Sequence, residues 1–199
     1  MEGNYIITIA RQFGSLGRII GKKLAKELNI AYYDRELIEK AAEAMGLPVS
    51  SLASLDDKMS GTFQKMLYPL GISSSSTQSK LYETQKSIIL DAANNSSCVI
   101  VGRCADYILR EHPHVLNVFI YADYKHRLDN CINDLHIYPI EAKKLLTDVD
   151  SARKLYHKFY TGCDFESIDG KQLMVDSGAF GIDGSVDLIK NAAKIKFEL

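Results

Sequence analysis

The chain has 199 residues, of which 46% are hydrophobic and 25% charged, and its formal net charge is −1. This composition supports one folded domain with a buried core and excludes an intrinsically disordered chain. No segment approaches the roughly 18 unbroken apolar residues that a membrane helix needs. The near-neutral charge argues against binding nucleic acid through its backbone.

The N-terminal sequence and the cysteines indicate the compartment. The opening MEGNYIITIARQ lacks the basic head and long apolar run of a signal peptide. No CxxC pair occurs among the cysteines, which are Cys98, Cys104, Cys131 and Cys163. We therefore expect reduced thiols in a cytoplasmic protein, without a disulfide framework or a metal site.

The first part of the chain alternates short strands with helices. Residues 5–9 form a β-branched run typical of a buried parallel strand. A glycine-containing loop follows, and apolar residues then recur four apart over residues 20–28, as on one face of a helix. Residues 31–33 are a second strand candidate. A second helix is predicted over residues 34–45, with the aspartate at its start as the cap.

The periodicity is lost over residues 50–79. Four consecutive serines at 73–76 make this stretch polar and without period. We predict a mobile insert here, within a single domain of residues 1–199. Helical periodicity returns at residues 78–93.

The second part of the chain continues the same alternation. Strands are predicted at 98–101, 115–121 and 173–176, and helices from 123, over 140–159 and over 181–196. Alternating strands and helices of these lengths favour an α/β fold. We predict a five-stranded, mostly parallel sheet with helices on both faces.

The glycine loop, residues 11–18, joins the first strand to the first helix. In this setting successive backbone N–H groups form a concavity at a helix N-terminus, which binds anions. Gly14 and Gly17 permit the close approach, and Arg18, with Arg11 as a second cation, suits a phosphate. An ordinary tight strand–helix turn is the competing interpretation.

The loop departs from the phosphate-loop signature G-x-x-x-x-G-K-[ST]. With Gly17 and Arg18 in the Gly-Lys positions, Gln12 replaces the first glycine and Ile19 replaces the hydroxyl residue that normally holds Mg²⁺. Ser15 is the nearby hydroxyl that remains as a substitute. The loop alone does not decide between a phosphate site and a turn.

Further cations follow later strands. Gly102 and Arg103 come directly after the strand at 98–101, where ligands bind in open parallel sheets. Arg103 is either a ligand-binding cation or a surface residue at the sheet edge. Asp106 accepts hydrogen bonds from a base, orients Arg103, or simply adds charge at a helix N-terminus.

The long helix at 140–159 carries a basic cluster that includes Arg153. Such a cluster suits a lid that closes over a triphosphate, whereas a solvated helix face with i,i+3 pairs such as Asp150–Arg153 is the alternative. Arg127 on the preceding helix similarly fits a surface ion pair.

Three segments in order together resemble the cytidylate kinase-like family, a branch of the P-loop nucleoside monophosphate kinases. They read IITIARQFGSLGRIIGKKLAKELNIAYYDRELIEKAA, CVIVGRCADYILREHPHVLNVFIYA and LLTDVDSARKLYHKFYTG. The resemblance implies a three-layer P-loop kinase fold with a helical lid at about 131–160, and it places the monophosphate-binding insert at the mobile segment.

The resemblance also implies roles for individual residues. The donor nucleotide would contact Arg11, Gly14, Ser15, Gly17 and Arg18, and Arg127 would lie beside its adenine. Leu16 stands where the family has a glycine. The acceptor would contact Asp34, Gly102, Arg103 and Asp106, and the catalytic residues would be Arg18, Asp150 and Arg153.

The activity implied is transfer of the γ-phosphoryl group from ATP, with Mg²⁺, to a nucleoside monophosphate or a similar small phosphorylated acceptor. The expected partners are these small molecules, without nucleic acid or membrane. A nucleotide-binding sensor or decayed kinase without turnover is the alternative, because the loop lacks the usual lysine and hydroxyl residue.

Overall fold

A computed structural model describes residues 3–35 and 75–199. Its core is a five-stranded sheet in which all four pairings are parallel. The strand order is β2-β3-β1-β4-β5. The strands are β1 (Ile6–Arg11), β2 (Ala31–Tyr33), β3 (Cys98–Val101), β4 (Val115–Tyr121) and β5 (Leu173–Asp176). The sheet predicted as mostly parallel is therefore parallel throughout.

Strand β1 lies in the centre of the sheet and is buried on both faces. Ile6 pairs with Cys98 of β3 on one side and with Val115 of β4 on the other. The side chains of β1 from Ile6 to Ile9 are at most 1% exposed. Because the strands are parallel, their C-terminal ends meet at one edge of the sheet, and the glycine loop begins there.

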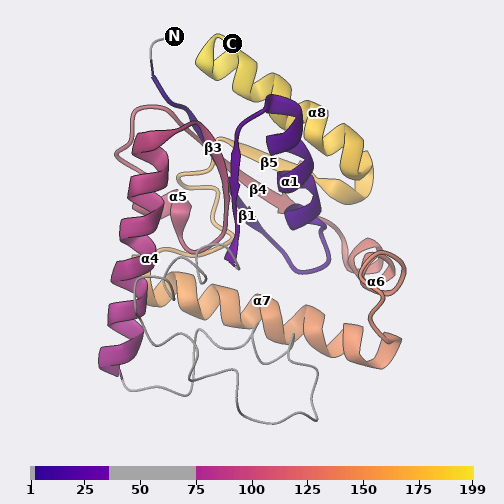
Figure 1. Ribbon diagram of the computed structural model, residues 1–199. Helices are drawn as coiled ribbons and strands as arrows, with labels where there is room; N and C mark the ends of the chain where they lie inside the picture. Colours follow the sequence, from indigo (N-terminus) through magenta and orange to yellow (C-terminus); the bar gives the residue numbers. More distant parts are fainter. Residues whose placement is uncertain (1–2, 36–74) are drawn as a thin grey trace.

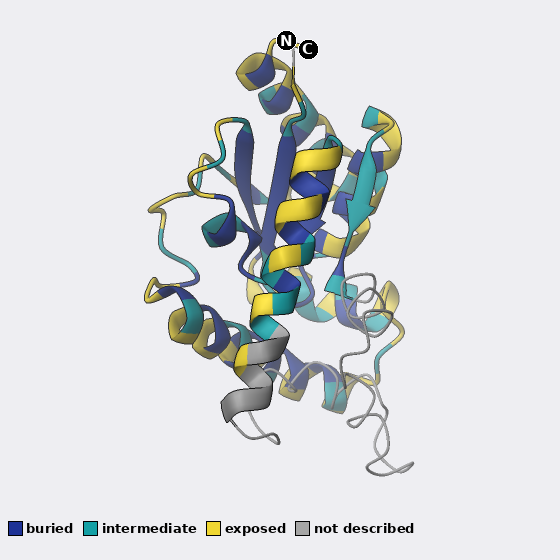
Figure 2. Ribbon diagram, turned by 60° about the vertical axis from the view of Figure 1, so that its left-hand side comes forward, coloured by how far each residue is buried: buried dark blue, intermediate teal, exposed yellow. Residues whose placement is uncertain are grey.

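Helices cover both faces of the sheet, as predicted. On one face α1 (Gly17–Leu28) and α8 (Ser177–Phe197) bury the larger apolar cluster, and α4 (Ser75–Asn95) with the short α5 (Ala105–Ile108) covers the other. In Figure 2 the strands β1, β3 and β4 are mostly dark blue and the edge strand β2 is teal, while α4 alternates buried and exposed positions along its length.

Two further helices lie at the C-terminal edge of the sheet. Helix α6 (Tyr124–Asn133) follows β4 and is capped by Asp123, whose carboxylate accepts from His126 N. Helix α7 (Pro139–Thr161) crosses beneath the ends of the strands (Figure 1). An apolar cluster around Phe13 packs both helices against the glycine loop. The lid expected at 131–160 corresponds to the end of α6 and most of α7.

Some predicted segments fall differently or lie elsewhere. The closing helix begins at Ser177 rather than 181, because the Asp176 carboxylate caps it, and Gly181 breaks it with a φ of 63°. Residues 36–45 of the second predicted helix and 50–74 of the predicted mobile insert lie outside the described residues, while 75–79 begin α4. None of the described helices is both long and apolar enough to cross a membrane.

Candidate active site

The glycine loop turns sharply between β1 and α1. Gly14 has a φ of 75°, and Leu16, directly before α1, adopts the left-handed conformation at φ 56°. A side chain at position 14 would place its Cβ 2.6 Å from the backbone oxygen of Arg127, so only glycine fits. Leu16 holds a conformation that costs a non-glycine residue about 1–2 kcal/mol, which tertiary contacts must offset.

Helices α6 and α7 hold the backbone of this loop by hydrogen bonds. Asn130 Nδ2 donates to Gly14 O at 2.8 Å. Phe13 N donates to Asp150 Oδ1 at 2.7 Å, and Arg127 Nη1 donates to Phe13 O at 3.3 Å. The shape of the loop therefore depends on side chains that come from more than 110 residues further along the chain.

Asp150 and Arg127 form a nearly buried ion pair at the loop. Arg127 Nη1 lies 2.6 Å from Asp150 Oδ2, and the two side chains are 13% and 11% exposed. Burial raises the pKa of Asp150, and Arg153, the Phe13 N–H and Arg127 oppose that rise. Both carboxylate oxygens accept hydrogen bonds, as an ionised group does. Arg127 is thus bound to the loop in this structure, and its contact with adenine stays a prediction.

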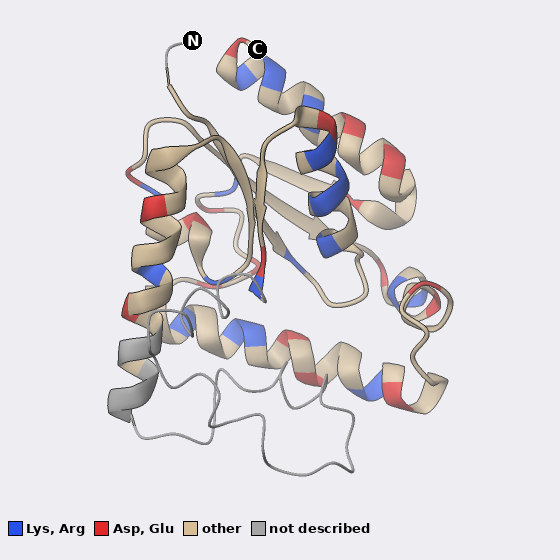
Figure 3. Cartoon of the chain, viewed as in Figure 1, with Lys and Arg blue, Asp and Glu red and all other residues tan. Residues whose placement is uncertain are grey.

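Four arginines lie close enough to affect one another electrostatically at the end of β1. They are Arg11, Arg35, Arg103 and Arg153, which we call the arginine cluster. Arg153 on α7 donates through Nη1 to the backbone oxygen of Arg11 at 3.0 Å. The Arg11 guanidinium lies against Gly102, where any Cβ would collide with it. Figure 3 shows Lys and Arg positions in blue along α7, the helix that crosses beneath this edge of the sheet.

Burial and mutual repulsion disfavour the positive charges of the arginine cluster. Burial and the like charges of Arg153, Arg103 and Arg35 lower the pKa of Arg11, and no ion pair in the described ranges joins Arg11 to a carboxylate. Burial lowers the pKa of Arg153 to about 10, with Asp150 opposing that change. Guanidinium groups stay protonated in proteins, so an anion bound beside the cluster would offset this repulsion.

Arg18, the expected phosphate-binding cation, pairs with Asp34, the expected acceptor-binding acid. Arg18 Nε lies 2.7 Å from Asp34 Oδ2, with side chains 57% and 7% exposed. The Tyr32 hydroxyl donates to the same carboxylate oxygen at 3.3 Å. The structure thus brings two predicted site residues together, with the exposed guanidinium at the mouth of the glycine loop.

Ser15 braces the loop. Its side chain is fully buried. The hydroxyl Oγ lies 2.9 Å from Gln12 O and 3.2 Å from Ile120 O, and both backbone oxygens are acceptors for its single proton. Gly17 lets α1 begin directly beside Arg11, since a Cβ there would lie 2.7 Å from the Arg11 Cβ. Within the described ranges, no group of three or more His, Cys, Asp or Glu side chains is arranged to hold a metal ion.

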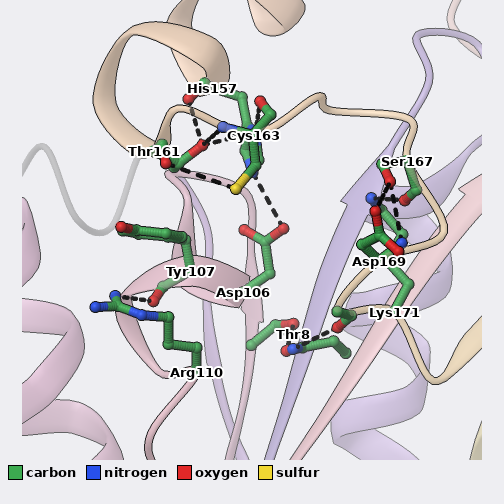
Figure 4. Close-up of polar contacts among 12 residues, drawn as sticks. Thr8, Asp106, Tyr107, Arg110, His157, Thr161, Cys163, Ser167, Asp169 and Lys171 are labelled. Atoms are coloured by element: carbon green, nitrogen blue, oxygen red, sulfur yellow. Dashed lines mark hydrogen bonds and ion pairs between the residues drawn. The ribbon is translucent and has the colours of Figure 1, made fainter.

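The turn after β3 has three consecutive residues with positive φ. Gly102, Arg103 and Cys104 have φ values of 80°, 60° and 56°. The Arg103 guanidinium carbon lies 5.8 Å from the centre of the Tyr156 ring on α7. Asp106 follows in α5 and lies 3.2 Å from His157 Nε2, also on α7 (Figure 4). Two residues of the turn at 102–106, Arg103 and Asp106, therefore contact α7.

Three residues at the site escaped the sequence analysis. Asn130 is one of several polar residues on α6, and nothing in its spacing marks it. Arg35 directly follows Asp34, and its charge beside a predicted acceptor residue was a usable signal. His157 was predicted only as a member of the basic cluster on the helix at 140–159, and its partner, the carboxylate of Asp106, was not predicted.

The comparisons with known proteins agree on family and fold. The model of the cytidylate kinase-like family matches residues 6–179. No curated protein matches the chain. An uncharacterized protein from Eubacterium ventriosum is 25% identical, with a TM-score of 0.74, and the match covers 96% of this chain and 99% of that one.

Two enzymes share the fold at lower identity. Shikimate kinase from Bacteroides thetaiotaomicron is 17% identical with a TM-score of 0.56, covering 98% of this chain and 99% of its own. A gluconokinase from Sinorhizobium meliloti is 11% identical with a TM-score of 0.53, covering 99% of this chain and 98% of its own. At these identities the likeness shows the fold alone, and it confirms the predicted P-loop kinase architecture.

Proposed function

The chain belongs to the cytidylate kinase-like family, and from this premise we propose that it transfers the γ-phosphoryl group of ATP to a small acceptor that itself carries a phosphate. The family and the kinase fold of its structural neighbours support a nucleotide-dependent kinase. A nucleoside monophosphate is the first candidate acceptor. The cytoplasmic location expected from the sequence stays part of this proposal.

The arginine cluster is the observation that carries the proposal. It gathers four guanidinium groups at the C-terminal edge of the sheet, and Asp150 is the acid that acts on Arg153 there. A single carboxylate on an acceptor would neutralise one positive charge. A phosphate dianion beside the donor's phosphates would neutralise the cluster and satisfy its rigid, forked donors. Arg11, which no ion pair in the described ranges joins to a carboxylate, therefore supports a phosphorylated acceptor over an acceptor that carries only a carboxylate.

The geometry suits phosphoryl transfer by alignment and charge neutralisation. Donor phosphates would lie on the N–H groups at the start of α1, which have no partner within the helix. The acceptor phosphate would lie against Arg103 and Arg11. Arg153, held between Asp150 and the Arg11 backbone, would approach the phosphoryl group in flight. Such positioning supplies most of the catalysis in phosphoryl transfer.

Magnesium fits this site only as part of the Mg·ATP substrate. Position 19 is isoleucine, and the Ser15 hydroxyl is buried against backbone oxygens. Asp150 and Asp34 are each engaged by an arginine. The loop thus lacks the usual protein hydroxyl ligand, and phosphate oxygens and water would surround the ion.

A nucleotide-binding protein without turnover is the second candidate. Leu16 places a side chain where backbone N–H groups should face phosphate, and Arg18 is engaged by Asp34. In that protein the nucleotide would bind at the glycine loop, and no phosphoryl group would be transferred.

Purified protein incubated with Mg·ATP and a panel of nucleoside monophosphates decides between these functions. We expect release of ADP with at least one monophosphate, in stoichiometric amounts with the phosphorylated product. Shikimate and gluconate serve as carboxylate acceptors that carry no phosphate, and we expect no turnover with them. Binding of ATP with no ADP release from any acceptor would favour the second candidate.

Arg103 is expected to act mainly on acceptor binding. Replacing Arg103 by alanine should weaken the acceptor by about 1.5–3 kcal/mol, because charged hydrogen bonds to the phosphate are lost. The effect would appear as a raised KM for the acceptor, with the KM for ATP nearly unchanged. Arg110→Ala is the matched control, since Arg110 follows the short helix α5, is exposed and lies over the ring of Tyr107. Equal effects on both substrates would contradict the assignment.

A further inference from the structure

His157 is a buried histidine of α7 whose two ring nitrogens both face hydrogen-bond acceptors. The side chain is 6% exposed. Nε2 lies 3.2 Å from Asp106 Oδ2, and Nδ1 lies 3.1 Å from the backbone oxygen of Cys163 (Figure 4). Thr161 Oγ1 is also 3.2 Å from Nδ1, but its own proton goes to His157 O at 2.7 Å.

This arrangement suits the imidazolium form of His157. A carboxylate and a carbonyl accept only, so each ring nitrogen must donate, and a neutral ring carries one N–H. Burial lowers the pKa of His157, but the hydrogen bond and charge of Asp106 and the Cys163 carbonyl outweigh it, and the net shift is upward. Among the described residues, the charge of Lys171, from the segment between α7 and β5, also acts on this pair and opposes the upward shift of the His157 pKa.

The carboxylate that His157 holds belongs to the turn that carries Arg103. Asp106 lies three residues after Arg103, in the first turn of α5. The turn has positive φ at three consecutive residues, so it depends on outside contacts to keep its shape. Two neighbouring residues of α7 supply them: the Tyr156 ring lies beside Arg103, and His157 binds Asp106.

We infer that His157 is a positioning residue for the acceptor site, whose protonated ring holds Asp106 and thereby keeps the 102–106 turn and Arg103 in place for an anion. The inference rests on the proposed function, in which Arg103 binds the acceptor's phosphate. A histidine whose pKa is raised in the folded state stabilises its contacts fully below its unfolded pKa of about 6.5. This stabilisation is lost as the pH rises through the folded-state pKa, because the ring loses its proton. Anion affinity should fall over the same interval.

The pH dependence has a distinctive sign. A phosphate monoester gains its second negative charge with a pKa of about 6, which by itself strengthens binding to arginines as pH rises. Loss of the His157 proton acts in the opposite direction and at higher pH. A decline of affinity above neutral pH is therefore assigned to the protein and not to the ligand.

The test uses methyl phosphate, a phosphate monoester, as the probe and needs no turnover. Its dissociation constant is measured by calorimetry from pH 6.5 to 9 in the wild type, in His157→Gln and in His126→Gln. The His157 midpoint is read from its ring Cε1–H resonance. We expect the wild-type dissociation constant to rise about fivefold across that midpoint. A change of this size corresponds to losing the stabilisation of one hydrogen bond, here the bond between His157 and Asp106. His157→Gln should be weak already at pH 6.5 and flat.

The control and the remaining outcomes complete the design. His126 forms an exposed pair with Asp123 at 2.9 Å, so His126→Gln removes a comparable pair away from the turn and should follow the wild type. A transition that persists in His157→Gln would belong to Lys171 and would overturn the inference. If His157→Gln does not fold, the wild-type Arg103 Nε–H resonance decides: it must shift at the His157 midpoint, and its failure to shift overturns the inference.

Kinetics separate this inference from the proposed function. If an acceptor is phosphorylated, its KM should follow the His157 midpoint while kcat stays within about twofold. A drop in kcat at constant KM would overturn the positioning role. If no acceptor is phosphorylated but methyl phosphate affinity still follows His157, the kinase proposal fails and the positioning of Arg103 stands.

Discussion

Replacing Arg153 by alanine is expected to lower turnover by about 10²–10⁴-fold while the affinity for ATP changes only a few-fold. The guanidinium of Arg153 is held at the end of β1 by the backbone oxygen of Arg11 at 3.0 Å and lies 3.7 Å from Asp150. From there it would reach the charge that develops between donor and acceptor phosphates. Interactions made mainly in the transition state lower kcat rather than binding.

Single-turnover and steady-state rates, together with an ATP titration, measure this effect. Arg153→Lys keeps the charge but loses the fork that contacts two oxygens, so we expect a smaller but still large loss. Lys158→Ala is the matched control: it removes an exposed cation of α7, paired with Asp164 at 3.1 Å, and should leave turnover unchanged. A loss of ATP affinity as large as the loss of turnover would contradict a transition-state role.

Replacing Gly14 by alanine should destabilise the protein by about 2–4 kcal/mol and weaken ATP binding more than tenfold. The new Cβ would meet the Arg127 backbone oxygen at 2.6 Å and the Cys131 sulfur at 3.0 Å, in a residue with φ 75°. Backbone on α6 cannot move away without breaking the Asn130 hydrogen bond to Gly14 O. The glycine loop would therefore shift as a whole.

Urea denaturation and ATP calorimetry measure the two effects of Gly14→Ala. Gly170→Ala is the control, because Gly170 has a φ of 76° but no atom within 4 Å of its Cβ position. It isolates the cost of the left-handed backbone, about 1 kcal/mol. If both variants lose the same stability and both retain ATP binding, the steric argument for the loop is wrong.

Helix α7 contacts both the proposed donor site and the proposed acceptor site. Its Asp150 binds the glycine loop, its Arg153 reaches the end of β1, and its Tyr156 and His157 hold the 102–106 turn. A movement of this helix would therefore alter the donor and acceptor sites together. The predictions for Arg153 and His157 test the two halves of this coupling separately.

The order of the elements and several of their bounds could be predicted from the sequence. The strands at 31–33, 98–101, 115–121 and 173–176 were predicted with the bounds that the structure has. Short β-branched or apolar runs that end at glycine, aspartate or polar residues carry this information locally. The positions of Arg11 and Arg103 at strand ends, and hence at one edge of a parallel sheet, follow from the same pattern.

The partners of the site residues were decided by tertiary structure. Spacing along the chain predicted Arg18 as a phosphate-binding cation and Ser15 as the substitute for the Mg²⁺-binding hydroxyl. It did not predict that Arg18 pairs with Asp34, or that Ser15 is buried against Gln12 O and Ile120 O. Arg127, expected beside adenine, binds Asp150 on the next helix. The sequence pattern determines which helix or strand carries a residue. The partners of its side chain depend on how the helices and strands pack against one another.

The same reason explains why the His157–Asp106 pair could not be predicted from the sequence. The two residues are 51 positions apart, and neither belongs to a motif that names the other. By itself the sequence determined the α/β architecture, the glycine loop and a family resemblance that places cations near phosphate. Only the packing of α6 and α7 across the strand ends decided that Arg127 holds the glycine loop and that Arg153 lies at the end of β1, because contacts between distant segments depend on how the elements pack together.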